Sequence, residues 1–228
     1  MLDLTAIILT KNEEKNISDC ILSIKELAKR IIVVDSYSDD KTCEIAKKLG
    51  AEIYHNKFVN YSTQFKFGLH TTDINTKWVL RIDADERITE AAKNDIIRLC
   101  NENENTDVNG LVLRFNVTFL GKKLYHGGIY PFRKLCIFKY GIGDIENRNM
   151  DEHIVLSSGR ILEVPSDCEH HDFKDITSWI NKHNWYSSRE IIDYYNRLNE
   201  ENTVQGKMDS IKNFVKFKIY YKLPIGFR

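Results

Sequence analysis

The sequence lacks several features that would assign it to a class at once. Lysine plus arginine and aspartate plus glutamate both number 33, so no excess of positive charge points to nucleic acid as a partner. No apolar run approaches the roughly 20 residues of a membrane span. The first ten residues have neither a basic start nor an apolar stretch long enough for a signal peptide. We therefore expect a cytoplasmic protein.

Cysteine is scarce, and its spacing is uninformative. The number of cysteines is odd, and no two of them form a C-x-x-C pair. This pattern fits reduced thiols better than a disulfide framework or a zinc site, so we expect no structural metal. The five residues are Cys20, Cys43, Cys100, Cys136 and Cys168.

At 228 residues, the chain is long enough for one α/β domain with an appendage, or for two small domains. Predicted strands and helices alternate over the first hundred residues. The strands are 4–10, 30–35, 51–55 and 76–82, and the helices are 17–27, 41–49 and 61–70. Strands that are apolar on both faces and joined by helices predict a parallel, doubly wound sheet. Such sheets bind ligands beyond the carboxyl ends of their strands.

Two aspartates follow the last of these strands. The apolar run 78–80 stops, and Asp83 and Asp85 come at i and i+2. Two such oxygen ligands can converge on Mg²⁺ or Mn²⁺, which usually carries substrate phosphates as well. The implied ligand is a diphosphate. The alternative is a polar strand end whose aspartates cap a helix that begins near Ile88.

Polar residues also follow the first two strands. No G-x-G-x-x-G motif is present after strand 4–10, and Asn12 and Glu13 occupy its place. Asp35 ends the second strand. These side chains can bind a nucleobase or a ribose, although each one is also typical of a cap or a turn. Together with the aspartate pair they indicate a cleft for a nucleoside diphosphate.

Several segments resemble those of family 2 glycosyltransferases with the GT-A fold. The segments are 8–14 (ILTKNEE), 33–42 (VVDSYSDDKT) and 78–87 (WVLRIDADER). Three further segments are similar to the bacterial branch that builds lipopolysaccharide cores and capsular polysaccharides: 126–131, 150–153 and 182–190. The resemblance covers roughly residues 3–195.

This resemblance implies a mostly parallel, Rossmann-like central sheet flanked by helices. The nucleotide-sugar half would be residues 1–105 and the acceptor and catalytic half 106–195, with a helical tail at 196–228. Thr10, Asn12 and Glu13 would line the nucleotide pocket. The full implied donor set is Thr10, Asn12, Glu13, Asp35, Gln64, Lys66, Asp83 and Ala84.

Within that set, the resemblance gives Asp35 to the uracil or ribose and Asp83 to the ribose and the metal. Asp85 would bind Mn²⁺ or Mg²⁺ directly. Lys66 departs from the family, which usually has asparagine there, so this lysine either reaches a phosphate or lies along a helix surface.

The resemblance also implies a catalytic base. Transfer with inversion needs one group to take the proton of the acceptor hydroxyl as its oxygen attacks the anomeric carbon. Glu152 matches this position best, and Asp151 is the second choice. The alternative is a solvated acidic turn. His170 would complete the metal site, with His183 as a second candidate.

The acceptor side is expected in the second half. Tyr130, in a glycine-rich loop, offers a stacking face for a sugar ring, or is a packing residue of an ordinary hairpin. Arg133 is either a phosphate contact or a surface charge. His183 shares one helix face with Trp179 and Tyr186, and this face is either a core contact or a wall of the acceptor cleft.

The tail segment 211–224 interleaves lysine with aromatic and aliphatic residues. This composition suits the anionic inner face of the plasma membrane, or else a helix packed on its own domain. The sequence as a whole predicts an inverting, metal-dependent glycosyltransferase. It would move a hexosyl residue from a UDP-sugar to a lipid-linked, lipopolysaccharide or capsular glycan. The alternatives are a D-x-D phosphatase and a non-catalytic nucleotide-sugar-binding or assembly protein.

Overall fold

The structure is a computed structural model that describes residues 1–147, 152–172 and 175–200. The chain divides into two compact units, residues 1–187 and 188–228. The helices are α1 (Ile17–Ile24), α2 (Thr42–Lys48), α3 (Tyr61–Thr71), α4 (Glu90–Glu102) and α5 (Ile176–Glu200). The strands are β1 (Leu2–Thr10), β2 (Ala28–Asp35), β3 (Glu52–His55), β4 (Trp78–Asp83), β5 (Glu86–Arg87), β6 (Val108–Phe119), β7 (Lys122–Lys123), β8 (Phe132–Lys139), β9 (Gly143–Ile145), β10 (Ile154–Leu156) and β11 (Arg160–His171).

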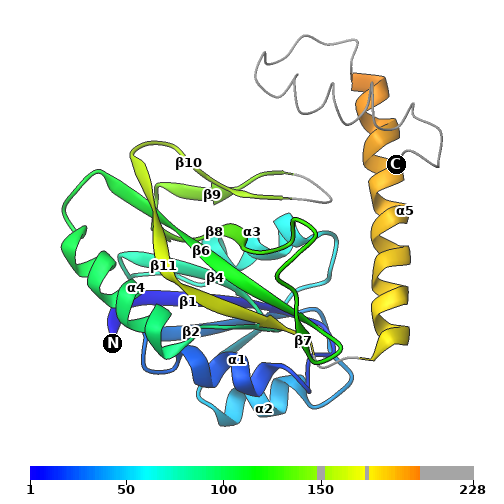
Figure 1. Cartoon of the computed structure of the whole chain (residues 1–228), viewed down its shortest axis with the longest axis horizontal. Coiled ribbons are helices and arrows are strands. Elements are labelled where there is room, and N and C mark those ends of the chain that lie inside the picture. The colour runs from blue at the N-terminus through cyan, green and yellow to red at the C-terminus, as the bar shows by residue number, and fades with distance from the viewer. Residues whose placement is uncertain (148–151, 173–174, 201–228) are drawn as a thin grey trace. The chain divides into compact units, whose positions relative to one another are not determined.

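One large sheet organises the first unit (Figure 1). Its strand order is β3-β2-β1-β4-β8-β6-β11-β5, and β7 pairs with β6. The strands β1 to β4 are mutually parallel where they pair, as the sequence predicts. Each of the seven strands and helices expected over the first hundred residues is present within a few residues of its predicted limits. The predicted α/β class with a central sheet is therefore confirmed.

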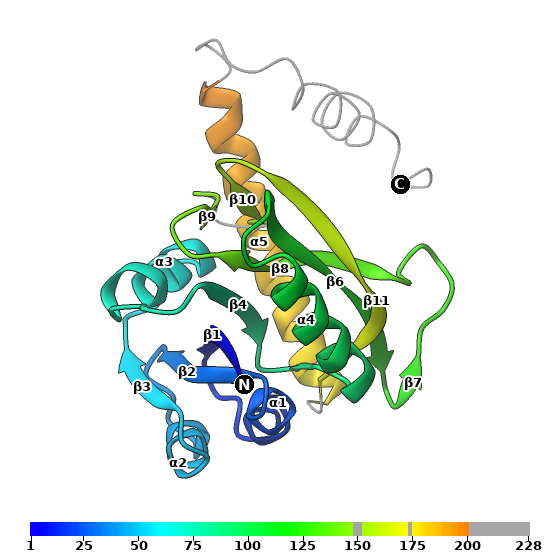
Figure 2. The same ribbon diagram turned by 90° about the vertical axis from the view of Figure 1, so that its left-hand side faces the viewer.

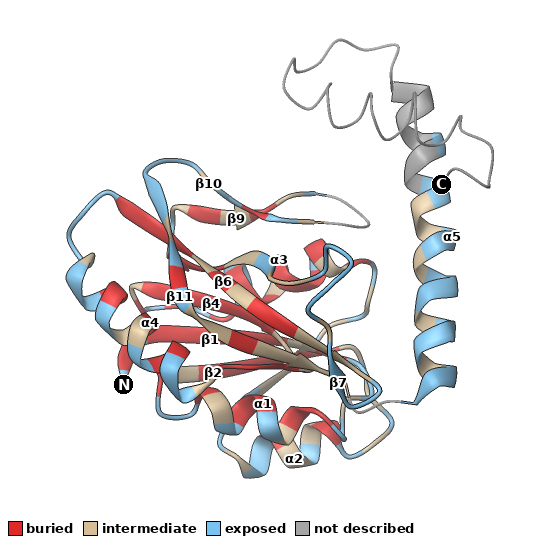
Figure 3. Ribbon diagram, in the orientation of Figure 1, coloured by how far each residue is buried: buried red, intermediate tan, exposed pale blue. Residues whose placement is uncertain are grey.

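Alternation along β1 builds a core on both faces of the sheet. Leu4, Ala6 and Ile8 pack into a cluster that includes the buried faces of α1 and α4. Ile7 points the other way and packs with Phe65 of α3. Figure 3 shows the consequence: the inner strands are buried almost throughout, while the helices bury one side only. A strand buried on both faces is what a parallel sheet covered by helices requires.

The second half of the sheet is mixed. β8 runs antiparallel to both β4 and β6, and β6 runs parallel to β11. Figure 2 shows β6 and β11 crossing the molecule beside α4. The end of β11 pairs with the short β5, which follows the two aspartates directly. A segment from the second half of the sequence thereby lies beside the D-x-D motif.

Helix α4 is capped by a threonine and not by either aspartate of the D-x-D motif. The side chain of Thr89 accepts the Ala92 N–H and caps α4, which begins at Glu90. The alternative interpretation, in which Asp83 and Asp85 cap this helix, is therefore wrong.

None of the helices within the described ranges is long and apolar enough to cross a membrane. The basic, aromatic segment 211–224 lies outside the described residues. Its predicted membrane contact stays a prediction.

Candidate donor and catalytic site

The three strands that carry candidate donor residues end at one edge of the sheet. Their register places Thr10 of β1 opposite Asp35 of β2, and Leu9 opposite Asp83 of β4. Because parallel strands share the edge at which they end, residues 73 positions apart in sequence meet there. The edge carries the carboxylates that the sequence assigns to the nucleotide and the metal.

Asp35 is a buried carboxylate that the neighbouring side chains and backbone hold by hydrogen bonds. Its side chain is fully buried and accepts hydrogen bonds from the Thr10 hydroxyl at 2.8 Å and from the Ser38 N–H at 2.7 Å. Burial raises its pKa, but the bonds from Ser38 and Thr10 outweigh burial and leave the pKa below its ordinary value. Asp35 is therefore held as a carboxylate at the end of β2.

The loop after β1 is fastened to the loop after β2. Asn12 has a positive φ of 57°, its N–H donates to the Ser38 hydroxyl at 2.9 Å, and its side-chain oxygen accepts the Asp39 N–H at 3.1 Å. The N–H of Glu13 donates to the Thr42 hydroxyl at 2.8 Å. These contacts give Asn12 and Glu13 a structural part in joining the two loops, and their predicted donor contacts stay predictions.

Gln64 and Lys66 project from helix α3 in different directions. Gln64 lies at the same edge of the sheet. The buried Gln64 amide donates to the Ser36 hydroxyl at 2.9 Å and to the Asn56 carbonyl at 3.1 Å. Lys66, two residues on, lies roughly 200° further around helix α3 and is partly exposed. The structure thus brings Gln64 beside the end of β2.

Asp83 is paired with a largely buried lysine from the neighbouring antiparallel strand. Lys134 of β8 lies 2.7 Å from Asp83 Oδ2 and 2.7 Å from Glu86 Oε1. Burial lowers the pKa of Lys134, but the two carboxylates outweigh burial and hold it above its usual range. Burial has the larger effect on Glu86, whose pKa is raised. Lys134 thus fixes Asp83 and neutralises most of the negative charge at this point.

Asp85 meets the C-terminal end of β11. The β5–β11 pairing sets Glu86 opposite His170, and the His171 N–H donates to the Asp85 carbonyl at 2.8 Å. His170 Nε2 lies 3.3 Å from Asp85 Oδ2, and Lys182 Nζ lies 3.5 Å from the same oxygen. The structure therefore brings together the predicted metal ligands Asp85 and His170.

His170 and Lys182 lower the pKa of Asp85. Burial raises the pKa of Asp85, but the hydrogen bond and charge of His170 and the charge of Lys182 hold it well below its usual range. Burial lowers the pKa of His170, but Asp85 raises it above the ordinary value. Nδ1 of His170 is buried and has no hydrogen-bond partner among the described residues. Asp85 is thus a carboxylate that is paired with His170 and Lys182.

The predicted base Glu152 lies in an ion pair. Arg81 Nη2 donates to Glu152 Oε1 at 2.6 Å, and the two side chains are 8% and 7% exposed. Arg81 precedes Asp83 by two residues on β4, so both point to the same face of the sheet. This geometry places Glu152 on the face that also carries Asp83. The second choice, Asp151, lies outside the described residues.

The first turns of α5 border the site with aromatic side chains. Trp185 packs against Phe58 and Tyr61, with ring centroids 6.1 and 6.2 Å away. The Tyr61 hydroxyl is hydrogen-bonded to Tyr186, one residue further along α5. His183 stacks on Trp179 at 3.9 Å between centroids, and its Nδ1 lies 2.8 Å from the Trp179 carbonyl. His183 thus contacts its own helix, and its acceptor role stays a prediction.

The remaining acceptor candidates have partners within the protein. The Tyr130 hydroxyl donates to Asp167 Oδ2 at 2.6 Å. Arg133 is more than half exposed and its Nε lies 2.7 Å from Glu163 Oε2. A surface ion pair of this kind favours the surface-charge interpretation of Arg133. Neither contact brings these residues to Asp83 or Asp85.

The sequence analysis assigns no role to the three basic residues that pair with the carboxylates of the site, namely Arg81, Lys134 and Lys182. Arg81 stands inside the quoted motif and Lys182 inside the last similar segment, but neither was assigned a role. One feature of the sequence could have identified Lys134, which is its place in the strand Phe132–Lys139 next to a run of apolar residues. A charged residue in such a strand is buried only with a partner, which the carboxylates of the D-x-D segment supply.

Comparisons with known proteins agree with this geometry. The model of the family described as "Glycosyl transferase family 2" matches residues 5–154. A Rickettsia typhi protein described as an uncharacterized glycosyltransferase is 28% identical over 203 residues, which cover 85% of this chain and 68% of that protein. A glycosyltransferase of Rickettsia bellii, also described as uncharacterized, is 40% identical over 93 residues, which cover 41% of this chain and 31% of that protein.

Among solved structures, residues 1–349 of Staphylococcus aureus TarS in complex with UDP-GlcNAc give a TM-score of 0.52 at 15% identity. The likeness covers 77% of this chain and 60% of the TarS chain. Similarity at this level concerns the fold, which is the GT-A-like α/β fold. The family model matches more than half of the sequence. The chain therefore belongs to glycosyl transferase family 2.

Proposed function

We propose that this chain transfers a hexosyl residue with inversion from a nucleotide sugar to a glycan acceptor. The observation that carries the proposal is the shared sheet edge on which the ionised Asp35, Asp83 and Asp85 lie. In a member of this family, such an edge suits a nucleoside diphosphate. The phosphatase alternative is not carried further, because the chain belongs to a transferase family.

Asp35 is the residue that we assign to the nucleoside. A buried carboxylate can accept a hydrogen bond from a base N–H or a ribose hydroxyl, and Thr10 keeps it in place at 2.8 Å. The similar TarS fragment was solved with UDP-GlcNAc, which makes uridine the first nucleoside to test. We infer that Gln64 supports this pocket through Ser36 and Asn56.

Asp83, Asp85 and His170 would hold Mn²⁺ or Mg²⁺. The chemistry of the donor set suits such an ion, because both carboxylates are ionised and His170 contacts Asp85. The ligand atoms of Asp83, Asp85 and His170 do not all lie within 4.8 Å of one another, so binding would draw Asp83 toward the other two. When bound, the cation would supply positive charge against the leaving diphosphate. Two lysines supply positive charge at the same carboxylates. Lys134 Nζ lies 2.7 Å from Asp83 Oδ2, and Lys182 Nζ lies 3.5 Å from Asp85 Oδ2.

Glu152 is the residue that we assign to the acceptor proton. As the acceptor oxygen attacks the anomeric carbon from the face opposite the nucleotide, its hydroxyl proton passes to a carboxylate. Arg81 binds Oε1 of Glu152 and so orients the side chain, which leaves Oε2 to take the proton. We propose an acceptor that is a lipid-linked, lipopolysaccharide or capsular glycan at the inner face of the membrane, with residues 196–228 as the membrane-contacting part.

A calorimetric titration with uridine diphosphate tests the donor site. We expect binding to the parent protein that is much tighter with Mn²⁺ than without it. The variant Asp85→Ala should lose the Mn²⁺-dependent part. Asp107→Ala is the control, because Asp107 is exposed and its carboxylate forms an ion pair with Arg160 at a different part of the sheet. Equal Mn²⁺ dependence in Asp85→Ala would refute the metal role of Asp85.

The membrane contact has its own test. Sedimentation of the full chain with anionic and neutral vesicles should show binding to the anionic ones that weakens with salt. A variant with the lysines of segment 211–224 changed to glutamine should stay in solution. Equal recovery with neutral vesicles would contradict the electrostatic part of this proposal.

A further inference from the structure

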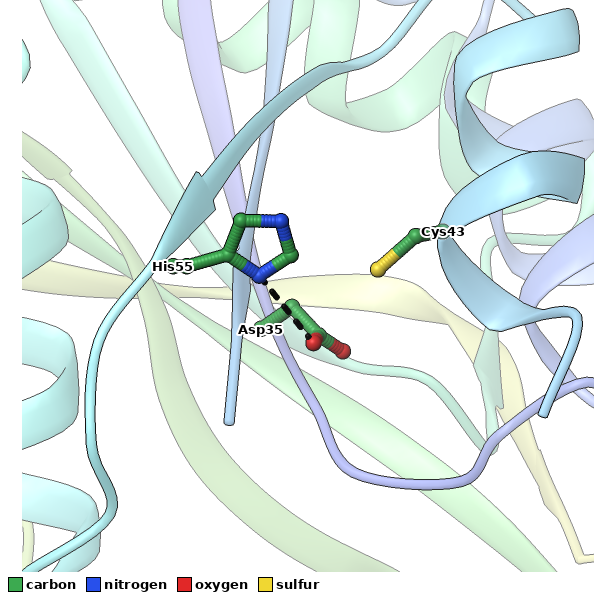
Figure 4. A group of neighbouring side chains, drawn as sticks. All are labelled: Asp35, Cys43 and His55. Atoms are coloured by element: carbon green, nitrogen blue, oxygen red, sulfur yellow. Dashed lines mark ion pairs between the residues drawn. The ribbon is translucent and has the colours of Figure 1, made fainter. Parts of the chain in front are cut away.

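A second group of metal-ligating side chains lies beside the D-x-D edge. Within the described ranges, Asp35, Cys43 and His55 are the one group of three such residues whose ligand atoms all lie within 4.8 Å of one another. Figure 4 shows the Cys43 thiol and the His55 ring directed toward the Asp35 carboxylate. The three residues offer one sulfur, one nitrogen and one oxygen.

The topology of the fold brings these residues together. β2 and β3 are parallel, and their register pairs Asp35 with His55 at the final residue of each strand. Helix α2 connects the two strands, and Cys43 lies in its first turn. All three side chains therefore come from one β-α-β connection.

The spacing is close to what zinc requires. His55 Nδ1 lies 3.5 Å from Asp35 Oδ2. Two ligand atoms at 2.0–2.1 Å from a tetrahedral zinc ion are about 3.3 Å apart. The Cys43 sulfur lies within 4.8 Å of both of these atoms. The fourth position would be left for water, as in zinc sites with three protein ligands.

Neighbouring side chains hold the ligands in orientation. Thr10 and Ser38 donate to the Asp35 carboxylate, and Tyr37 stacks on the His55 ring with centroids 5.5 Å apart and planes at 21°. Contacts of this kind orient ligands in metal sites. The His55 side chain is half exposed, so an ion can enter from solvent.

Cys43 differs from the other thiols of the chain. It is partly exposed, whereas the other four cysteines are buried: Cys20, Cys100, Cys136 and Cys168. Its sulfur lies in the first turn of α2 and is directed toward the Asp35 carboxylate (Figure 4). Cys43 is therefore the one partly exposed thiol that shares a site with other metal-ligating side chains.

We propose that Asp35, Cys43 and His55 bind one zinc ion and that zinc at this site excludes the donor nucleotide. A mixed sulfur, nitrogen and oxygen set suits zinc, whereas Asp83 and Asp85 suit Mg²⁺ or Mn²⁺. The exclusion rests on the proposed function, in which Asp35 binds the nucleoside. Zinc would occupy the carboxylate that the nucleoside needs, and would so inhibit transfer in competition with the donor.

Titration of the metal-free full chain with Co²⁺ tests the site without any nucleotide. Coordination by a thiolate gives Co²⁺ a sulfur-to-metal absorption band that oxygen and nitrogen ligands do not give. We expect this band at one equivalent of Co²⁺ and its loss on adding one equivalent of Zn²⁺. Cys43→Ser should lack the band, and His55→Gln should weaken Co²⁺ binding at least tenfold. Asp85→Ala should keep the band.

A parent protein without the band, or a Cys43→Ser variant that retains it, would overturn the zinc site. The exclusion is tested by titrating uridine diphosphate with and without one equivalent of Zn²⁺. We expect weaker binding with Zn²⁺ in the parent but not in Cys43→Ser, which controls for zinc held by the nucleotide itself. Equal effects in both proteins would overturn the exclusion. No nucleotide binding in zinc-free protein would instead refute the proposed function and leave the zinc site standing.

Discussion

Arg81 and Glu152 form a buried ion pair across 71 residues of sequence, with Nη2 and Oε1 2.6 Å apart. Arg81 also lies over the Phe65 ring, with its guanidinium carbon 5.7 Å from the ring centroid. An arginine held by an aromatic ring and a carboxylate has little freedom, so it fixes the position of Glu152. The carboxylate that we propose as the base is therefore also part of a buried ion pair, and its effects on transfer and on stability need separate measurements.

The variant Glu152→Gln should separate these effects. Its amide oxygen can still accept from Arg81, so we expect the fold and the affinity for uridine diphosphate to change little. It cannot take a proton, so transfer should fall by about 100-fold or more. Glu163→Gln, at an exposed ion pair with Arg133, is the control and should leave transfer unchanged. Transfer by Glu152→Gln at the parent rate would mean that another group is the base.

Removing the lysine between two carboxylates should be costly. Glu86 is 1% exposed, and Lys134 is 2.7 Å from both Glu86 and Asp83. In Lys134→Met, Glu86 loses its cation, so the free energy of unfolding should fall by about 3–5 kcal/mol. Urea denaturation measures this loss.

A second variant shows whether the unpaired charge of Glu86 causes the loss of stability in Lys134→Met. Lys134→Met with Glu86→Gln removes the unpaired carboxylate as well, so part of the lost stability should return. Lys122→Met, on the exposed strand β7, is the control and should change stability little. If the double variant is no more stable than Lys134→Met, the lost free energy of unfolding comes from packing and not from the unpaired charge.

Lys182 should compete with a divalent cation for Asp85. Its Nζ is 3.5 Å from Asp85 Oδ2, and a positive charge at about 4 Å opposes a second one by about 1 kcal/mol even in water. In Lys182→Met, Mn²⁺ binding without nucleotide should therefore tighten about fivefold. Paramagnetic relaxation of water protons measures that affinity. Lys47→Met, on the exposed side of α2, should leave it unchanged; a weaker Mn²⁺ affinity in Lys182→Met would contradict this account.

The parallel half of the fold could be predicted because its information is local. Apolar strands, connecting helices and terminal aspartates such as Asp35 and Asp83 lie within short stretches of sequence, and parallel pairing brings their ends to one edge. The mixed half is different. The pairing of β11 with β5, which joins His170 to Asp85, depends on strands about 80 residues apart and has no local signal.

The same distinction explains what was missed in the site. The carboxylates could be recognised from a motif, but their partners Arg81, Lys134 and Lys182 are defined by cross-strand and tertiary contacts. The zinc site that we propose is similar. Cysteine spacing alone predicts no metal, because only one ligand is a cysteine and the others come from two strand ends.

Asp40 gives a test of stability against pH at the loop that shapes the donor pocket. Its Oδ1 accepts the Thr42 N–H at 2.9 Å and its Oδ2 accepts the Glu14 N–H at 3.1 Å. Burial raises the pKa of Asp40, but the Thr42 and Glu14 bonds leave it below the ordinary value. A lowered pKa in the folded state means that this stability is present above the unfolded pKa, about 3.9, and is lost as pH falls through the folded pKa.

The variant Asp40→Asn should therefore be less stable than the parent at pH 6, by about 1–2 kcal/mol, because an amide oxygen replaces a charged acceptor. This difference should shrink as the pH falls below about 4, since the parent carboxylate then becomes protonated. Urea midpoints at pH 6 and pH 3 measure both values. Asp39→Asn, at the exposed neighbouring position, is the control and should show no such convergence. A difference between parent and Asp40→Asn that is equal at both pH values would mean that the charge of Asp40 contributes nothing to the stability of the loop.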